Sequence, residues 1–164
     1  VVGTAISYPL GQDTSETKVD ASLEEVENGA DELDICMNVG IFKSGGYGEV
    51  EGEMKEIVAQ VKEDHERVIV KFIIETGFLT DDEIKKASEL VVASGADFVK
   101  TTSGLGPRGA SLNDVAIIKS VVGDKVKVKV AGGIETYEQA IAFIEAGAHR
   151  IGTSHAVEIV GESK

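Results

Sequence analysis

The hexapeptide SGADFV at residues 94–99 joins a helix-like stretch to an apolar run, and related hexapeptides stand at residues 28–33 (NGADEL) and 146–151 (AGAHRI). In each copy the glycine can take the left-handed conformation that ends a helix, and the residues after it enter an extended run. Three copies of one helix-to-strand junction indicate a chain built by repeating a strand and a helix.

Six short runs rich in β-branched and other apolar residues alternate with the helix-like stretches. We predict strands at residues 4–8, 32–38, 68–75, 98–101, 126–131 and 150–153. Their spacing is that of a strand followed by a crossover helix. Most of these runs are nearly continuously apolar, as expected for parallel strands that are covered on both faces.

Helix starts are also visible in the sequence. Three pairs have the spacing of a capping box, in which two side chains satisfy backbone N–H groups reciprocally. These pairs are Ser22 with Glu25, Thr80 with Glu83, and Thr136 with Gln139. One apolar stripe at helical spacing marks the core-facing side of a helix and consists of Ile84, Ala87, Leu90 and Val91.

The six strand–helix units contain no low-complexity linker, which predicts one α/β domain over residues 1–164. The pattern alone allows either a parallel barrel or a doubly wound sheet. A complete TIM (β/α)8-type barrel usually takes about 250 residues. Six units would therefore form an incomplete barrel, or one that another chain completes.

The composition is acidic, with a formal net charge of −13. Nucleic acid would be repelled, because no basic patch stands apart from the rest of the sequence. A small phosphate stays compatible with this charge where local donors override the distant field. Acidic residues gather in helical stretches and are predicted to form a solvated outer surface: Glu24, Glu25, Glu27, Glu49, Glu51, Glu53 and Glu56.

Cysteine and histidine usage argues against a disulfide-bonded or metal-binding protein. The one cysteine, Cys36, excludes an internal disulfide and is expected to be a small buried residue, as are Met37 and the phenylalanines. His65, His149 and His155 lack metal-ligand spacing, so we predict no metal and no cofactor. No apolar run reaches the roughly 18 residues of a membrane span, and no charged leader is present, which predicts a cytoplasmic protein without membrane partners.

Charged residues inside the apolar strands are the most informative feature, because a buried charge is unfavourable unless it is paired or used. Alternation places Asp34 on one strand face with Cys36 and Asn38, and it places Lys71 on one face with Glu75. Such residues near the ends of parallel strands are candidates for chemistry.

Two further lysines, Lys100 and Lys129, come at or near the ends of two other strands. Taken singly, each is also explained as an ion-paired or solvent-reaching side chain. Together they favour attack on a carbonyl, for which an amine of ordinary pKa near ~10.4 must first lose its proton. A second ammonium nearby and desolvation both lower the pKa of such an amine. A carboxylate such as Asp34 can then move protons through water.

Two glycine-containing loops, at residues 131–136 and 152–154, follow the last two predicted strands. Their backbones can approach an anion closely and present N–H groups to it. Either loop alone is also explained by turn geometry. Together they match the usual phosphate position of phosphate-binding barrels.

Five segments resemble, in order, the signature segments of deoxyribose-phosphate aldolase: SYPLG (7–11), GADELD (29–34), KFIIETG (71–77), ADFVKTTSG (96–104) and KVAGGI (129–134). The resemblance spans nearly the whole chain and implies a TIM barrel and a metal-free class I aldolase. The implied reaction is the reversible cleavage of 2-deoxy-D-ribose 5-phosphate to acetaldehyde and D-glyceraldehyde 3-phosphate.

The resemblance also implies a role for each matching residue. Lys100 would form the Schiff base, Lys129 would be the cation that keeps it uncharged, and Asp34 would be the general acid/base with a bound water. Lys71 would be a supporting group of the pocket. The phosphate-contacting positions would be Gly104, Gly132, Gly133, Thr153 and Ser154.

The chain departs from the family pattern at three places. His155 stands where members often have a small residue such as serine, and Arg108 is expected to be exposed, with a phosphate contact as the alternative. The chain begins at what resembles the family's third strand, which implies a fragment, a homo-oligomer or a barrel completed by a second chain. The alternatives for function are a related Schiff-base aldolase for another phosphorylated aldehyde and an inactive truncated barrel that serves as an interaction module.

Overall fold

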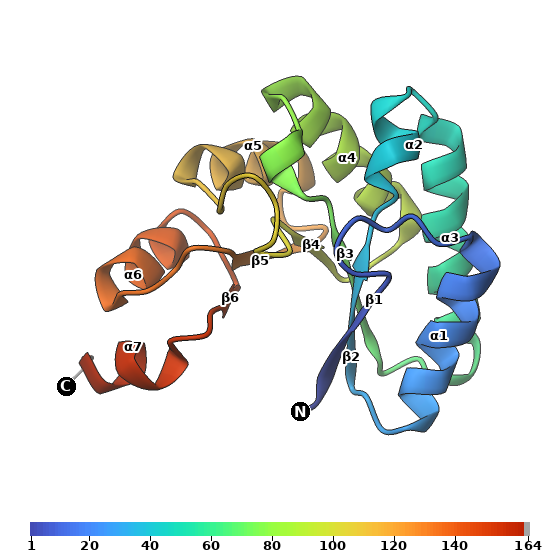
Figure 1. The fold of residues 1–164 in the computed structure, drawn as a ribbon, viewed down its shortest axis with the longest axis horizontal. Helices are drawn as coiled ribbons and strands as arrows, with labels where there is room; N and C mark the ends of the chain where they lie inside the picture. The colour runs from blue at the N-terminus through green and yellow to red at the C-terminus, as the bar shows by residue number, and fades with distance from the viewer. Residues whose placement is uncertain (163–164) are drawn as a thin grey trace.

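In the computed structural model, which describes residues 1–162, six parallel strands form a curled sheet with helices packed along its outer side (Figure 1). The elements follow the order β1 (Gly3–Ile6), α1 (Ser15–Glu27), β2 (Glu32–Cys36), α2 (Val39–Lys43), α3 (Tyr47–Asp64), β3 (Ile69–Ile73), the 3-10 helix η1 (Thr76–Phe78), α4 (Asp81–Ser94), β4 (Phe98–Lys100), α5 (Leu112–Val122), β5 (Lys127–Ala131), α6 (Tyr137–Glu145), β6 (Arg150–Gly152) and α7 (Ala156–Glu162). The alternation of strand and helix agrees with the repeated junctions in the sequence.

The strands pair in chain order from β1 to β6, and every pair is parallel. A doubly wound sheet brings strands together out of chain order, whereas a TIM-type barrel adds each strand beside the previous one. The strand order therefore decides for the barrel, a choice that the sequence pattern leaves open. Within residues 1–162, β1 and β6 are the two edges of the sheet, so the described strands form an open arc (Figure 1).

The strands lie where the sequence predicts them, but several end earlier. The runs predicted at residues 32–38 and 68–75 are strands only over β2 and β3. Asn38 was wrongly placed on a strand face, because its side chain accepts the Ile41 N–H at 3.0 Å and caps α2. Glu75 was also wrongly placed there, since it follows β3 in the left-handed conformation, with φ 51° and ψ 63°.

The core lies between the outer face of the arc and the helices. Leu33, Ile35 and Phe72 point outward from β2 and β3 and are fully buried. The predicted stripe of α4 and Met37 belong to the same buried cluster. Four of the five phenylalanines are buried as predicted, although Phe98 lies outside this cluster, on the inner face beside Lys71. The prediction is wrong for Phe78, which lies in the short η1 turn and is 42% exposed.

Two of the three predicted capping boxes, at the starts of α4 and α6, are confirmed. The box predicted at Ser22 and Glu25 is wrong, because α1 already begins at Ser15. The side chain of Thr14 caps this helix by accepting the Thr17 N–H at 3.3 Å. Ser22 lies fully buried within the helix instead.

One of the acidic residues predicted on the outer surface is buried. Glu53 of α3 lies beneath α1, where Lys18 Nζ is 2.6 Å from Glu53 Oε1 and also donates to the Cys36 carbonyl at 3.0 Å. A carboxylate can be buried when a partner neutralises it, and Lys18 supplies that partner from the neighbouring helix. The other acidic residues of that prediction are exposed or half-exposed.

Candidate active site

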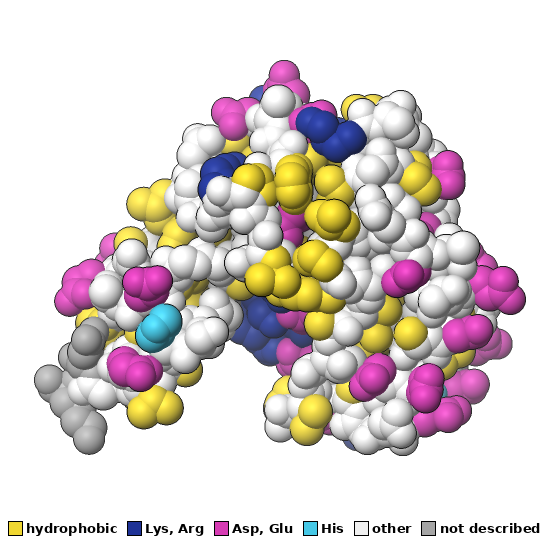
Figure 2. Space-filling view, in the orientation of Figure 1, with side chains coloured by type: hydrophobic (Ala, Val, Ile, Leu, Met, Phe, Trp, Pro, Cys, Tyr) yellow, Lys and Arg dark blue, Asp and Glu magenta, His cyan; other side chains and the backbone are white. Residues whose placement is uncertain are grey.

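The inner face of the arc carries charged side chains, because the residues between the core-facing ones point to the opposite side of each strand. Four of them come from neighbouring strands: Asp34 of β2, Lys71 of β3, Lys100 of β4 and Lys129 of β5. Asp34 is in register with Lys71, and Lys100 is in register with Lys129. Figure 2 shows Lys and Arg side chains gathered in the hollow between the two arms of the molecule.

Asp34 is the common partner of the three lysines. Lys100 Nζ donates to Asp34 Oδ2 at 2.8 Å, and Lys129 Nζ donates to the same oxygen at 2.5 Å. Because they share one acceptor atom, the two lysine nitrogens lie close together. Lys71 Nζ lies 2.9 Å from Asp34 Oδ1, on the other side of the carboxylate.

The charges of this cluster shift the pKa values of two of its members. Burial alone would raise the pKa of Asp34, but the charge of Lys100 and the hydrogen bonds from the lysines outweigh it and hold that pKa well below its usual range. Burial lowers the pKa of Lys129; Asp34 opposes this effect, whereas the charges of Lys100 and Lys71 reinforce it. The cluster thus combines an ionised carboxylate with an amine that loses its proton more easily than usual.

A second carboxylate, Glu32, connects this cluster to the far edge of the sheet. Lys71 is fully buried, and its Nζ lies 2.7 Å from Glu32 Oε2. The two groups form a close ion pair whose angles do not meet hydrogen-bond geometry. Arg150 of β6 also pairs with Glu32 across the inner side of the arc. Sequence reasoning missed Glu32 and Arg150, although Glu32 stands two residues before Asp34 and therefore on the same strand face.

Tyr8 is a further residue that sequence reasoning passed over. Lys100 Nζ lies 5.9 Å from the centre of the Tyr8 ring, and the Tyr8 hydroxyl donates to the Ser103 carbonyl. The segment after β1 thereby reaches over the end of β4. Cys36 is buried as predicted, and burial raises the pKa of its thiol to about 12, which keeps it protonated at neutral pH.

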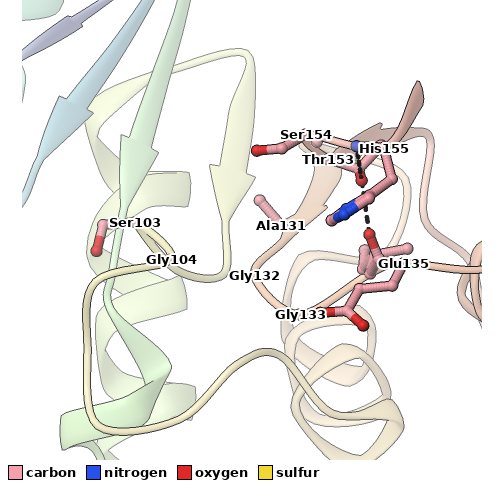
Figure 3. A pocket seen from close by; sticks show the side chains of 11 residues that line it. Ser103, Gly104, Ala131, Gly132, Gly133, Glu135, Thr153, Ser154 and His155 are labelled. Atoms are coloured by element: carbon pink, nitrogen blue, oxygen red, sulfur yellow. Dashed lines mark hydrogen bonds between the residues drawn. The ribbon is translucent and has the colours of Figure 1, made fainter. Parts of the chain in front are cut away.

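A cavity of about 390 Å³ opens next to the lysine cluster, where the loops after β4, β5 and β6 meet (Figure 3). Its walls include all five positions that the resemblance assigns to phosphate: Gly104, Gly132, Gly133, Thr153 and Ser154. Gly152 joins the two regions, because it lines the cavity and a Cβ built on it would lie 3.5 Å from Lys129 Cε.

The turn between β5 and α6 depends on glycine. Gly132 has φ +98° and Gly133 has φ +75°, a region that other residues rarely adopt. A Cβ on Gly132 would lie 2.4 Å from Thr102 Oγ1, so the loops after β4 and β5 could not pack as they do. Close backbone approach and freely pointing N–H groups are what an anion site requires.

Two residues that depart from the family pattern lie in different surroundings. His155 lines the cavity, and its ring is directed toward the glycine turn (Figure 3). Its backbone N–H donates to Thr153 Oγ1 at 2.9 Å. Arg108 is exposed, as expected, but its guanidinium is held by the buried Asp114 at 2.7 and 3.0 Å and by the Thr76 carbonyl at 3.0 Å. Arg108 does not line the cavity.

Residues 1–162 contain neither a cluster of metal ligands nor a helix that could cross a membrane. No group of three or more His, Cys, Asp or Glu side chains is placed to hold a metal ion. None of the helices in this part of the chain is both long and apolar enough to cross a membrane.

Comparison with known proteins identifies the family of the chain. The family model described as DeoC/LacD family aldolase matches residues 1–159. The chain belongs to this family. A deoxyribose-phosphate aldolase from Caldanaerobacter subterraneus subsp. tengcongensis is 48% identical over 99% of this chain and 70% of its own length.

Solved structures of aldolases share the fold. The structure titled "QR15, an Aldolase" superposes with a TM-score of 0.93 at 44% identity, over 99% of this chain and 72% of the other. A deoxyribose phosphate aldolase from Aeropyrum pernix, described as having a unique tetrameric structure, gives a TM-score of 0.88 at 31% identity, over 98% of this chain and 67% of the other. The DeoC aldolases have a TIM-type barrel, of which the described arc is a part.

Proposed function

We propose that this DeoC/LacD family chain catalyses the reversible cleavage of 2-deoxy-D-ribose 5-phosphate to acetaldehyde and D-glyceraldehyde 3-phosphate. The observation that carries the proposal is the meeting of Lys100 and Lys129 at one oxygen of Asp34. Two amines and an ionised carboxylate are the groups that imine chemistry needs. The name deoxyribose-phosphate aldolase, carried by the Caldanaerobacter relative, supports the choice of substrate.

In the proposed mechanism, the uncharged Nζ of Lys100 attacks the C1 aldehyde of the open-chain sugar. Loss of water from the resulting carbinolamine gives the imine. Removal of the proton from the C3 hydroxyl then breaks the C2–C3 bond, releases glyceraldehyde 3-phosphate and leaves an enamine. Protonation of that enamine at C2 and hydrolysis free acetaldehyde and the lysine. Asp34, acting through water, is proposed to move the protons in these steps.

Lys129 is proposed to act on Lys100 through its positive charge, without forming a covalent bond to the substrate. Its position beside Lys100 on the same Asp34 oxygen disfavours two protonated amines at once. Lys71 is proposed as a supporting group, since its fully buried ammonium holds Asp34 from the opposite side.

The phosphate group is proposed to bind in the cavity beside the cluster. Gly104, Gly132, Gly133, Thr153 and Ser154 all line it, and backbone N–H groups with hydroxyls are suitable partners for phosphate oxygens. The position of Gly152, which lines the cavity and lies beside Lys129, supports binding of one ligand across both. A homo-oligomeric state and a cytoplasmic location stay predictions for this chain.

Substrate profiling tests the proposed reaction. Turnover of 2-deoxyribose 5-phosphate, followed through release of acetaldehyde, is expected to exceed turnover of fructose phosphates. A preference for fructose phosphates would indicate the related aldolase considered as an alternative. Absence of turnover with either class, in protein that remains folded, would contradict the proposal.

Replacement of Lys129 by leucine tests its proposed role. We expect the imine with acetaldehyde to form more slowly in Lys129→Leu and its pH optimum to move upward. Two effects act in this direction, because Lys100 loses a like-charged neighbour and gains a fuller share of the Asp34 oxygen. The rate of borohydride-trapped adduct formation should be measured from pH 5 to about 11, a span that extends past the ordinary lysine pKa near ~10.4.

Lys119→Leu provides a matched control for Lys129→Leu, since Lys119 lies on α5 and its ammonium donates to the Gly123 carbonyl at 2.8 Å, outside the cluster. This control should keep the wild-type pH profile. A profile that is unchanged in Lys129→Leu as well would remove Lys129 from the mechanism.

A further inference from the structure

Glu75 occupies an unusual position immediately after β3. Its backbone is left-handed, with φ 51° and ψ 63°, and its side chain is only 1% exposed. Residues other than glycine adopt this conformation uncommonly and keep it where the surrounding structure holds them. Such a residue, carrying a buried carboxylate close to the lysine cluster, calls for a reason beyond packing.

The carboxylate of Glu75 contacts two points of the loop between β4 and α5. Oε2 accepts the Ser103 N–H at 2.9 Å. Oε1 has no hydrogen-bond partner among the described residues and lies against Gly106, where a built Cβ would come within 2.7 Å of it. One side chain therefore anchors the short segment 103–106 at Ser103 and packs closely against it at Gly106.

This segment forms one wall of the proposed phosphate cavity. Ser103 and Gly104 line that cavity, whereas Glu75 does not and lies behind the loop. The Gly104 N–H donates to Thr102 Oγ1 at 3.1 Å, and the same hydroxyl donates to the Ala131 carbonyl at 2.8 Å. A shift of the segment would therefore also disturb the contact between this loop and the glycine turn after β5.

The opposite end of the same loop has its own anchor. Arg108 is bound there by Asp114 and by the Thr76 carbonyl. Glu75 is thus not needed to hold the loop as a whole on the barrel. Its contacts act on the part of the loop that faces the cavity.

We propose that Glu75 is a positioning residue that shapes the β4–α5 loop for the phosphate group of the substrate. The inference rests on the proposed function, because it takes the cavity as the phosphate site. The oxygen of Glu75 that accepts the Ser103 N–H joins the end of one strand to the loop of the next. Glu75 touches neither the substrate nor the reacting atoms in this role.

The test compares substrates with and without phosphate. In Glu75→Ala, the ratio of kcat/KM for 2-deoxyribose 5-phosphate to that for 2-deoxyribose is expected to fall about tenfold, chiefly through KM. Glu75→Gln retains an oxygen that can accept the Ser103 N–H, so it should return the ratio close to the wild-type value. A purely structural role would affect both substrates alike and would leave the ratio unchanged.

Glu53→Ala is the matched control for the loss of a buried carboxylate. Glu53 is also buried, but it lies in α3 and pairs with Lys18 of α1, away from the loop. This control should lower thermal stability without changing the ratio. An equal change of the ratio in Glu53→Ala and Glu75→Ala would overturn the inference.

A binding measurement separates this inference from the proposed reaction. Calorimetric titration with glycerol 3-phosphate, which has a phosphate and no aldehyde, does not depend on imine formation. We expect about tenfold weaker binding to Glu75→Ala and near-normal binding to Glu75→Gln. If wild-type protein forms no imine but shows this pattern, the reaction is refuted and the inference stands. If the imine forms and glycerol 3-phosphate binds all variants equally, or does not bind the wild type, the inference fails alone.

Gly106→Ala provides an independent variant at the other end of the contact. The backbone of Gly106 is not left-handed, so the main effect of an alanine there would be to displace the Glu75 carboxyl group, whose Oε1 would lie 2.7 Å from the new Cβ. The single variant should weaken glycerol 3-phosphate binding, whereas adding it to Glu75→Ala should have little further effect. Strictly additive effects of the two changes would contradict the proposed contact.

Discussion

In Lys100→Met, borohydride in the presence of acetaldehyde is expected to trap no adduct, and cleavage of 2-deoxyribose 5-phosphate is expected to fall at least about a thousandfold. Methionine has a similar length and no nucleophilic nitrogen, so the first covalent step cannot occur. Asp34 would still hold Lys129 and Lys71 through the contacts at 2.5 and 2.9 Å. The protein should therefore remain folded while the chemistry is lost.

Intact mass and peptide mapping measure this result directly. Wild-type protein should carry one ethyl group in place of a hydrogen on Lys100 Nζ after reduction, a mass gain of C2H4, and Lys100→Met should gain none. Lys127→Met is a suitable control, because Lys127 begins β5, is exposed and lies over the Phe98 ring rather than on Asp34. Its adduct should equal that of the wild type.

The most informative contrary outcome is an adduct on Lys129. Lys129 shares the Asp34 oxygen with Lys100, and its own pKa is lowered, first by burial. Modification of Lys129 in the wild type would exchange the roles proposed for the two lysines. Modification of neither would remove the Schiff base from the proposal altogether.

The inward and outward faces of the strands could be predicted from the sequence because they depend on local alternation. In β2, Leu33 and Ile35 point into the core while Asp34 points to the inner face, as a period of two residues requires. The same local logic located the capping boxes of α4 and α6. It failed at α1, because Thr14 caps this helix without the glutamate or glutamine that marks a capping box.

The choice between barrel and doubly wound sheet could not be made from the sequence, because strand order depends on pairings between distant segments. The buried pair of Lys18 and Glu53 escaped prediction for the same reason, since its members lie 35 positions apart. A signal for Lys18 was present, because it shares a helical face with the buried Val26, two steps of four residues away.

The candidate site was predicted in part. Asp34, Lys71, Lys100 and Lys129 were singled out as charges in apolar strands, and the structure brings them together. Glu32 and Arg150 pair across the arc, and no local pattern indicates which residues face each other over that distance. Glu75 was taken for a strand residue, because its left-handed backbone is imposed by the loops around it.

Asp34→Asn is expected to destabilise the protein and to slow turnover strongly without preventing imine formation. The amide carries no charge, so the three neighbouring lysines lose their shared anionic partner, and we expect the free energy of unfolding to fall by about 3–5 kcal/mol. The loss of proton transfer should lower turnover by roughly a hundredfold to ten-thousandfold. Lys100 remains in place and should still give a trapped adduct with acetaldehyde.

Asp97→Asn separates the two effects. Asp97 precedes β4 at the opposite end of the barrel, where its carboxylate accepts hydrogen bonds from Lys62 Nζ at 2.9 Å and from the Val70 N–H at 2.8 Å. Its replacement should also lower stability, measured by urea unfolding, but should leave turnover per folded molecule unchanged. Equal loss of turnover in both variants would mean that Asp34 contributes only to stability.

The pH dependence of stability provides a further test of Asp34, and its sign follows from the direction of the pKa shift. The cluster holds the pKa of Asp34 well below its usual range, so the unfolded chain takes up this proton more readily than the folded protein. The stabilisation from Asp34 is therefore complete above about pH 4, the usual value for an unfolded aspartate, and is lost progressively as the pH falls further. The difference in unfolding free energy between wild type and Asp34→Asn should be largest at neutral pH and should shrink as the pH falls below about 4. A difference that stays constant down to pH 3 would show that the ionised carboxylate does not hold the three lysines together.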